Sequence, residues 1–398
     1  MDLISHSNKA SLDIDLESNT QHTDAEIQRQ PYTWKKVLAY IKREEKKIDE
    51  FLTNILSINS LNIILSGAGS SAFIGDAVAL TWQKETGVPT QAIPTTDLVT
   101  HFEKKVETSE PLLLVSFARS GNSPESTATI ERANELCEQV YHLIITCNKG
   151  GKLAQMNSRD NNYVFLLPAE AEDQSLAMTN SFTSMALAAT VIPMLKSKSF
   201  ESLSEQINLL ASYGENIIQK YNSLLYQVAE LDFERIIFLG SGPSWGIAKE
   251  SHLKVQELTN GQVIGKYDSF LGFRHGPKAI INSKTLLVYL LSNNENTRRY
   301  EKDLIDQISQ HNIKLKTFSL SETELKNSGI DFSIALSKSN ELWESFWAIL
   351  CTLPAQIIGF YKSLMIGLNP DAPSPDGTIS RVVEGVTIYD DGYKELSV

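Results

Sequence analysis

Hydroxyl groups gather in two short turns of this 398-residue chain, each directly after an apolar stretch. The turns "SGAGSS" and "ARSGNS" contain the candidate phosphate-binding residues Ser70, Ser71, Ser120, Gly121, Asn122 and Ser123. Hydroxyls, backbone N–H groups and the positive end of a helix bind phosphate in proteins. Gly121 lets the backbone curl closely around an anion, and Pro124 suits the first turn of a following helix. The two turns together predict one site for the phosphate of a small molecule.

Each turn taken alone has a simpler explanation, because serine often caps the start of a helix. Neither turn continues into the GK[ST] sequence of a P-loop, which disfavours a nucleoside triphosphate. Gly67 and Gly69 lack a third glycine at the dinucleotide spacing, since Gly75 lies too far along, so NAD is disfavoured as well. The prediction therefore depends on two turns from neighbouring strands gripping one phosphate.

Side chains that could transfer protons lie in the second half of the chain. Lys254 and Glu257 are three residues apart in "AKESHLKVQELTNG", so they share a face of the predicted helix. A carboxylate can act as a general base, but helical Lys/Glu pairs are commonly exposed ion pairs, and that alternative stays open. His275 lies in the turn "FRHGPK", and imidazole accepts and donates protons near neutral pH. His252, one turn before Glu257, is a competing candidate.

The elements that must position these groups alternate between apolar strands and helices. "NIILSGAGSSAFIGDAVAL" and "RIIFLGSGPSWGIAKESHL" share a strand, a Gly-x-Gly turn and a helix start, about 170 residues apart. Continuous Val, Ile, Leu and Phe strands between helices indicate parallel sheets covered on both faces. We expect an α/β protein with two doubly wound, flavodoxin-like αβα domains and ligands at the carboxyl ends of their strands.

The chain divides into four predicted parts. These are a polar lead with a helix (1–48), a phosphate-binding domain (49–205), a domain with the proton-transfer groups (206–366) and a C-terminal tail over the site (367–398). In the second domain, "LLSNNENTRRYEK" stands where the first has its serine-rich turn. We therefore expect one phosphate site per chain.

Composition excludes several classes of function. The net charge of −12 argues against a nucleic-acid partner. The apolar stretch "MALAATVIPML" near the middle is too short to span a bilayer, and the first residues do not resemble a signal peptide. We expect a cytoplasmic protein with no membrane partner. Three cysteines and seven scattered histidines form no metal-binding spacing, so no metal site is expected.

Three stretches in order, "KVQELTNG", "LGFRHGPK" and "NPDAPSPDGTISRVVEGV", resemble proteins with tandem sugar-isomerase (SIS) domains. From about Gln30 onward the chain is similar to the galactosamine-6-phosphate deaminase/isomerase group, also called tagatose-6-phosphate ketose/aldose isomerases. It is more distantly similar to the isomerase half of glucosamine-6-phosphate synthase. The resemblance implies a hexosamine or ketohexose 6-phosphate held on the two turns, Thr179 as a further contact, and no metal or redox cofactor.

The resemblance also implies roles for the other candidates. Glu257 would be the base that moves a proton between C2 and C1, and Lys254 would contact the phosphate end of the sugar. His275 would open the sugar ring from the partner subunit, which implies a homodimer, or a higher homo-oligomer, with a shared active site. The synthase has an imine-forming lysine in its C-terminal loop, and the nearest match is Arg381. A guanidinium stays protonated, so Arg381 is expected to bind charge or to close the tail.

The choice of reaction follows from what the chain lacks. The synthase generates ammonia in an additional glutaminase domain, and the start of this sequence offers no counterpart. Release of ammonium is therefore favoured: galactosamine 6-phosphate would become tagatose 6-phosphate. The alternatives are a tagatose-6-phosphate ketose/aldose isomerase that does not deaminate and, less favoured, a non-catalytic sugar-phosphate sensor.

Overall fold

The first lobe is built on a five-stranded parallel sheet. The computed structural model describes residues 22–156, 161–310, 314–326, 328–383 and 385–389. The strand order is β2-β1-β3-β4-β5. The strands are β1 (Asn62–Ser66), β2 (Thr90–Ala92), β3 (Leu112–Ala118), β4 (Val140–Thr146) and β5 (Asn162–Leu166). Every residue of β3 is buried, as expected for a central strand covered on both faces.

The second lobe repeats this topology. Its parallel sheet has the order β10-β9-β8-β6-β7, the same relative order as in the first lobe. The strands are β6 (Arg235–Gly240), β7 (Ile264–Ser269), β8 (Thr285–Leu290), β9 (Lys316–Thr323) and β10 (Phe332–Ser337). Ile63 of β1 pairs with Leu113 of β3, and Ile236 of β6 pairs with Leu286 of β8. The prediction of two doubly wound α/β domains is confirmed.

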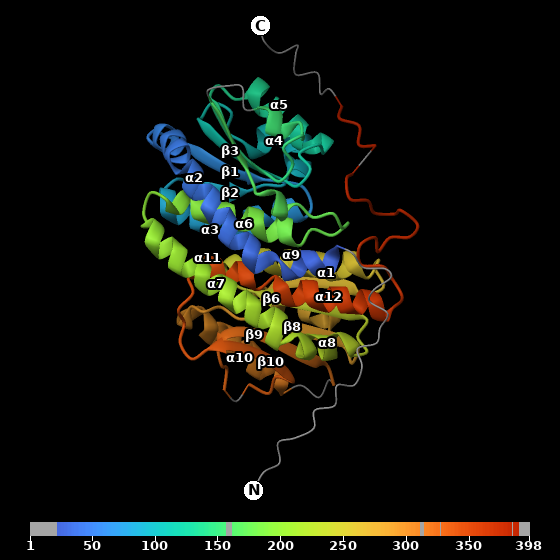
Figure 1. The fold of residues 1–398 in the computed structure, drawn as a ribbon. Coiled ribbons are helices and arrows are strands. Elements are labelled where there is room, and N and C mark those ends of the chain that lie inside the picture. Colours follow the sequence, from blue (N-terminus) through green and yellow to red (C-terminus); the bar gives the residue numbers. More distant parts are fainter. Residues whose placement is uncertain (1–21, 157–160, 311–313, 327, 384, 390–398) are drawn as a thin grey trace.

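Helices cover both sheets and fill the space between them (Figure 1). The first-lobe helices are α3 (Ser70–Thr86), α4 (Thr95–Lys105), α5 (Pro124–Leu136) and α6 (Asn180–Met194). The second-lobe helices are α9 (Pro243–Leu258), α10 (Glu295–Ser309), α11 (Glu344–Leu350) and α12 (Leu353–Met365). Four more lie outside these sets: α1 (Thr23–Gln28), α2 (Gln30–Leu56), α7 (Phe200–Lys220) and α8 (Asn222–Glu230). Proline at the start of α5 and α9 costs no hydrogen bond there.

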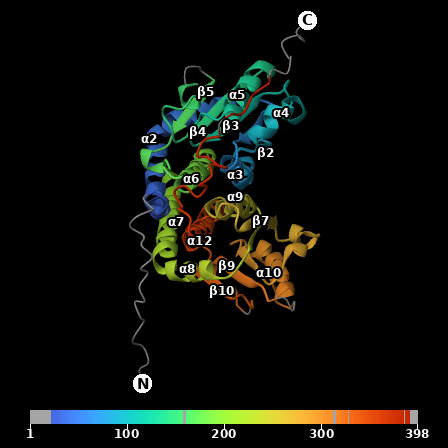
Figure 2. The ribbon, with the colours of Figure 1, turned by 90° about the vertical axis from the view of Figure 1, so that its right-hand side faces the viewer.

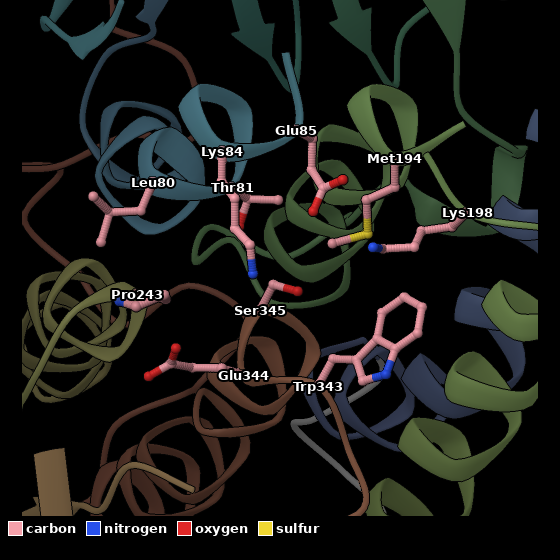
Figure 3. A pocket seen from close by; sticks show the side chains of 10 residues that line it. All are labelled: Leu80, Thr81, Lys84, Glu85, Met194, Lys198, Pro243, Trp343, Glu344 and Ser345. Atoms are coloured by element: carbon pink, nitrogen blue, oxygen red, sulfur yellow. The ribbon is translucent and has the colours of Figure 1, made fainter. Parts of the chain in front are cut away.

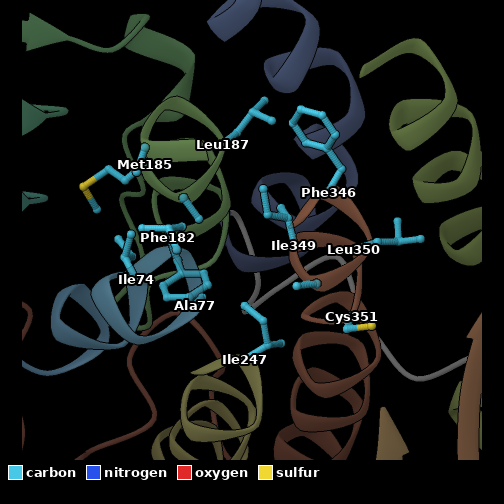
Figure 4. Close-up of a cluster of buried hydrophobic side chains, with 14 of the residues drawn as sticks. Ile74, Ala77, Phe182, Met185, Leu187, Ile247, Phe346, Ile349, Leu350 and Cys351 are labelled. Atoms are coloured by element: carbon cyan, nitrogen blue, oxygen red, sulfur yellow. The ribbon is translucent and has the colours of Figure 1, made fainter. Parts of the chain in front are cut away.

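The two lobes meet through a packed helical layer. Side chains of α3, α6, α9 and α11 interdigitate between the sheets (Figure 4), and Ile74, Phe182 and Ile247 are fully buried. Gly246 lets α9 lie directly on α3, because a Cβ atom there would come within 2.4 Å of the Ala77 backbone nitrogen. This contact fixes the distance between the lobes and brings the end of α9 towards the phosphate turns.

Two long helices also join the lobes. α2 packs against α6 and α7, and the buried Trp34 indole donates a hydrogen bond to the Thr183 hydroxyl at 3.0 Å. The predicted divisions at 48/49 and 205/206 fall inside α2 and α7, so these helices extend across both boundaries. The four-part division stays a prediction.

One segment has the length and composition of a membrane span. It runs from Glu344 to Met365, and 83% of its most apolar window is buried inside the protein. It consists of α11 and α12, which are separated by Cys351 and Thr352. The burial of this segment in the protein core explains its apolar residues. The cellular location stays a prediction.

The C-terminal segment returns to the first lobe. After α12 it passes between the lobes and continues along the first lobe towards α5 (Figure 2). The Asp371 carboxylate accepts hydrogen bonds from the backbone N–H and the hydroxyl of Thr23, both at 2.7 Å. The Leu176 N–H donates to the Asp371 carbonyl at 3.0 Å. The start of the described chain and the loop before α6 are thus both fastened to Asp371.

Candidate active site between the lobes

A pocket of about 150 Å³ lies at the carboxyl ends of β1 and β3. Its walls include Ser71 from the first predicted turn and Ser120, Gly121 and Ser123 from the second. Gly69 and Gly121 have φ angles of 56° and 67°, a region that favours glycine. The structure therefore brings both turns to one pocket, at the sheet edge where ligands bind in this class of fold.

Three of the residues predicted to contact phosphate do not line this pocket, and their roles stay predictions. The Asn122 carboxamide faces away and accepts a hydrogen bond from the Lys152 N–H at 3.0 Å. Ser70 is buried beside the Glu250 carboxylate of the second lobe, where burial raises the pKa of that carboxylate and Ser70 opposes the rise. Thr179 is fully buried, and its backbone N–H donates to Asp173 at 2.8 Å. Its hydroxyl also donates to Asp173, so Thr179 helps to fix the start of α6 rather than facing the pocket.

The C-terminal tail forms part of the pocket wall. Arg381, Val382 and Val383 line the pocket opposite the serine-rich turns. The Arg381 guanidinium donates to the Asp173 carbonyl and, at 3.3 Å, to the Glu172 carboxylate. These bonds fasten the tail to the loop before α6, and the role of Arg381 towards a substrate stays a prediction.

The proton-transfer candidates belong to a buried cluster on α9. The Lys254 ammonium is 2.6 Å from a Glu257 oxygen and 3.3 Å from a Glu250 oxygen. The side chains of Lys254 and Glu250 are 1% and 0% exposed, whereas that of Glu257 is 23% exposed. The exposed ion pair that the sequence allowed is therefore wrong for Lys254. A charge buried at this depth needs partners, and both carboxylates supply them.

Burial sets the electrostatics of this cluster. It raises the pKa of Glu250 to about 7, against the opposing attraction of Lys254. Burial alone would lower the pKa of Lys254, but the charges of Glu250 and Glu257 raise it, so this side chain stays an ammonium. Ionised Lys254 keeps Glu257 in a fixed position, with the remaining exposed part of its carboxylate free to contact a ligand.

The cluster faces the first lobe. Glu257 and Lys254 both contribute to the electrostatic environment of Arg119, the residue that precedes Ser120. Glu250 lies beside Ser70. The α9 carboxylates and the phosphate turns therefore adjoin across the boundary between the lobes, although they are more than 100 residues apart in sequence.

Sequence reasoning missed Glu250 and Arg119. Glu250 precedes Lys254 by four residues and Glu257 by seven, a spacing that places all three on one helix face. That pattern was available, but nothing in it showed that the face would be buried. Arg119 stands in the quoted turn, and its partners come from two distant segments.

The two candidate histidines have different environments. His275 is exposed in the loop after β7, on a short turn that follows Gly272–Arg274. His252 is packed against the Tyr267 ring, with centroids 4.8 Å apart, and its burial lowers its pKa. Burial thus disfavours the protonated form of His252, whereas His275 is free to meet another molecule.

A larger cavity of about 450 Å³ lies between α3, α6, α9 and α11 (Figure 3). Lys84, Glu85, Lys198 and Glu344 place two positive and two negative side chains around it, beside the Trp343 indole. Its walls come from the last turns of α3 and the start of α9. The start of α3 and the end of α9 lie near the serine-rich turns instead. Within the described residues no cluster of three or more His, Cys, Asp or Glu side chains could hold a metal ion.

Comparisons with known proteins agree with this arrangement. The SIS domain family matches residues 57–193. A Shewanella sp. (strain ANA-3) protein named D-galactosamine-6-phosphate deaminase AgaS is 40% identical over 371 residues, which cover 92% of this chain and 91% of that protein. The crystal structure of tagatose-6-phosphate ketose/aldose isomerase from Escherichia coli superimposes with a TM-score of 0.85 at 36% identity, covering 92% and 96% of the two chains.

A more distant likeness concerns the fold alone. The C-terminal domain of glucosamine-fructose-6-phosphate aminotransferase from Francisella tularensis has a TM-score of 0.73 at 18% identity and covers 88% of this chain and 98% of that domain. The resemblance to the synthase half that the motifs suggested is thereby confirmed at the level of the fold.

Proposed function

This chain belongs to the SIS-domain enzyme family that includes D-galactosamine-6-phosphate deaminase AgaS, and from this membership we propose that it is an isomerising deaminase of galactosamine 6-phosphate. The products would be tagatose 6-phosphate and ammonium. A role as a sugar-phosphate isomerase or deaminase is common to its sequence relatives and structural neighbours. The deamination and the galacto configuration are the parts that we propose.

One observation carries the proposal. A partly exposed carboxylate, Glu257, is held by the buried Lys254 beside a pocket with the hydroxyls and backbone groups that suit a phosphate. A general base must be fixed within reach of the proton that it removes. The phosphate turns would anchor one end of the sugar, and α9 would present the base to the carbon atoms near the other end.

The reaction balances without any further reactant except water. Ring opening gives the aldehyde form of the amino sugar. Glu257 removes the proton from C2, and an enolamine forms as the carbonyl oxygen at C1 takes up a proton. Return of a proton to C1 leaves an iminium group at C2. Water adds to C2, the C–N bond breaks, and the nitrogen leaves as ammonium while C2 becomes the ketone.

Residues of both lobes would contribute to the proposed reaction. Ser71, Ser120 and Ser123 would donate to the phosphate oxygens, together with the backbone N–H groups of their turns. Lys254 would hold Glu257 and add positive charge near the anionic substrate. Arg381 would hold the tail as a wall of the site.

We assign ring opening to His275 of a second copy of the chain. His275 is exposed on its loop, and no hydrogen bond of its imidazole ring is seen among the described residues. An apolar hollow of about 310 Å³ adjoins this loop, with Ala279, Ile281 and Ile308 in its walls. A dimer that covers the hollow would bring His275 to the partner's pocket.

Mixed dimers test this assignment. Glu257→Gln and His275→Ala chains, each inactive alone, would regain up to about a quarter to a half of the normal turnover when mixed if each site takes one residue from each chain. Absence of recovery in mixed dimers verified by mass spectrometry would place both residues in one chain's site.

An aldose–ketose isomerase without deamination is the second candidate. It is favoured by the name of the E. coli structural neighbour, whereas the Shewanella relative is named a deaminase. Both reactions use the same C2-to-C1 proton transfer. A non-catalytic sensor is less favoured, since a sensor needs no carboxylate held by a buried lysine.

Ammonium release decides between the candidates. Purified protein would be incubated with galactosamine 6-phosphate, glucosamine 6-phosphate and tagatose 6-phosphate, and ammonium and sugar products would be measured. Ammonium from galactosamine 6-phosphate, lost in Glu257→Gln, is the expected result. Interconversion of tagatose 6-phosphate with its aldose, without ammonium, would select the isomerase. If the protein catalyses neither reaction, the sensor is the remaining candidate.

A further inference from the structure

Arg119 is a buried cation at the edge of the phosphate pocket. It directly follows β3 and precedes Ser120, and only 8% of the residue is exposed. Arginine is rarely buried at this depth unless its donors are used. Within the described residues no carboxylate lies within ion-pair distance of its guanidinium, so its hydrogen bonds must be sought elsewhere.

The guanidinium donates to three backbone carbonyls on two separate segments. Nη1 donates to the carbonyls of Ser175, at 3.3 Å, and Leu176, at 3.0 Å, in the loop before α6. Nη2 donates to the Arg381 carbonyl in the C-terminal tail at 2.6 Å. Arg119 thus ties the end of β3 to a loop and to a tail that are 56 and 262 residues away in sequence.

Arg381 is held from two sides. Its carbonyl accepts from Arg119, and its own guanidinium donates to the Asp173 carbonyl and to Glu172. The next two residues, Val382 and Val383, lie against the pocket that holds Ser71 and Ser120. The position of this pocket wall therefore depends on the bond from Arg119.

Burial and nearby charges act on Arg119 in opposite directions. Burial lowers its pKa, Asp173 opposes this effect, Arg381 adds to it, and Glu257 opposes it. A phosphate dianion in the pocket would add negative charge beside the guanidinium and strengthen its preference for the buried position. Phosphate in the pocket would then stabilise the position of the tail, and the tail in this position would strengthen phosphate binding.

We propose that Arg119 is a positioning residue that latches the tail, through the Arg381 carbonyl, over the phosphate pocket. The latch encloses the substrate during the reaction and opens when substrate enters and product leaves. This inference depends on the proposed function, because it takes the pocket as the phosphate site. Lysine cannot replace the arginine here, since only the planar guanidinium offers several donors in fixed directions to separate acceptors.

The latched carbonyl belongs to the peptide bond that trypsin would cut, between Arg381 and Val382. Full-length protein would be treated briefly with trypsin, and cleavage at this bond would be followed by mass spectrometry with and without inorganic phosphate. We expect slow cleavage of the wild type, slower still with phosphate. In Arg119→Gln and Arg119→Lys the rate should rise about tenfold or more, which corresponds to the loss of one charge-assisted hydrogen bond.

Kinetics give a second reading of the same variants. Because the latch would enclose bound substrate, both variants should raise KM about tenfold while kcat changes less. Arg132→Gln is the matched control, because the half-buried Arg132 also donates to the tail, at the Tyr389 carbonyl, but does not line the pocket. It should leave the cleavage rate at Arg381 and KM near the wild-type values.

The outcomes separate the latch from the proposed function. Unchanged cleavage and KM in a folded Arg119→Lys protein, checked by circular dichroism, would overturn the latch even if Arg119→Gln misfolds. If phosphate protects the wild type and both variants equally, the pocket binds phosphate and the latch is wrong. If the variants release the tail but phosphate never protects it, the latch stands and the phosphate pocket of the proposed function fails.

Discussion

The two lobes carry the same turn in different surroundings. β6 begins at residue 235 and β1 at residue 62, and β8 and β3 begin at residues 285 and 112, so both pairs are 173 residues apart. Gly69 and Gly242, which start the helices after β1 and β6, have φ, ψ angles of 56°, −129° and 55°, −128°. The backbone of the turn is thus nearly identical in the two copies.

The surroundings of the second turn contain a buried acidic side chain. Glu301 is fully buried near Ser241, and its carboxyl group accepts a hydrogen bond from the Ser292 N–H at 2.9 Å. Burial raises the pKa of Glu301 to about 7. A phosphate would meet this carboxylate, whereas the first-lobe pocket offers Ser120 and Ser123 instead. The expectation of one phosphate site per chain stays a prediction.

The helices after the turns differ as well. At the same spacing of 173 residues, Glu257 and Lys254 of α9 correspond to Lys84 and Thr81 of α3. Lys84 and Thr81 line the 450 Å³ cavity (Figure 3). Corresponding positions of α3 and α9 therefore carry different side chains around two different cavities of the described structure. In the proposed function, the carboxylate of α9 acts with the serine-rich turns of the first lobe, and α3 has a lysine at the position of that carboxylate.

The largest expected effect concerns the base. Glu257→Gln should lower kcat about 10²–10⁴-fold, since general-base catalysis contributes a factor of that size. Lys84→Met, at the corresponding position of α3, should leave kcat within about twofold, because exposed surface changes have small effects. Ammonium release measures both variants. An equal loss in Lys84→Met would show that the cavity lined by Lys84 takes part in the reaction.

A smaller and pH-dependent effect is expected from Glu250. In Glu250→Gln, Lys254 pairs with Glu257 alone and holds its carboxylate more tightly, so kcat at pH 8 should fall about tenfold. The wild-type pKa of Glu250 is about 7, so its carboxylate is already protonated below pH 6. The difference between the two proteins should therefore shrink as the pH falls. The measurement is a pH–rate profile for each protein. Parallel profiles would show that Glu250 does not take part in the mechanism.

Ser71 and Ser244 occupy corresponding positions at the starts of α3 and α9. Ser71→Ala should raise KM about tenfold by removing one hydrogen bond to a charged group, with kcat little changed. Ser244→Ala should leave KM unchanged, because Ser244 is buried beside Cys351 in the second lobe. Steady-state kinetics with the substrate distinguish the pair. Equal KM values for both variants would mean that Ser71 does not contact the phosphate.

The smallest effect on catalysis is expected at Glu301. Glu301→Ala leaves the buried Ser292 N–H without its acceptor, so the free energy of unfolding should fall by about 1–3 kcal/mol. kcat and KM should stay near the wild-type values. Urea unfolding and the ammonium assay test the two statements. A loss of activity in a folded variant would show that the second-lobe turn affects the active site.

Local patterns predicted a large part of this structure. The central strands β1, β3, β6 and β8, the turn before α3 and the turn after β3 follow from apolar runs, whereas β7 is a mostly polar, partly exposed strand that no such run predicts. The motif that contains Lys254 and Glu257 was also found, because helical spacing alone places them together. Contacts between distant segments had no local signal. The bond from Arg119 to the Arg381 carbonyl of the tail joins residues 262 apart in sequence, and Arg119 was not among the predicted residues. The role of Thr179, whose partner Asp173 lies six residues before it, stays a prediction.

The sequence by itself determined which apolar runs form the central strands, where the two serine-rich turns lie, and which face of α9 carries Lys254 and the two carboxylates. These properties depend on neighbours a few residues away along the chain. Only the tertiary structure decided that Lys254 and Glu250 are buried, that Glu301 fills the second turn, and that the tail lines the first pocket. Desolvation and long-range hydrogen bonds depend on which distant segments pack together, and that packing is a property of the whole fold.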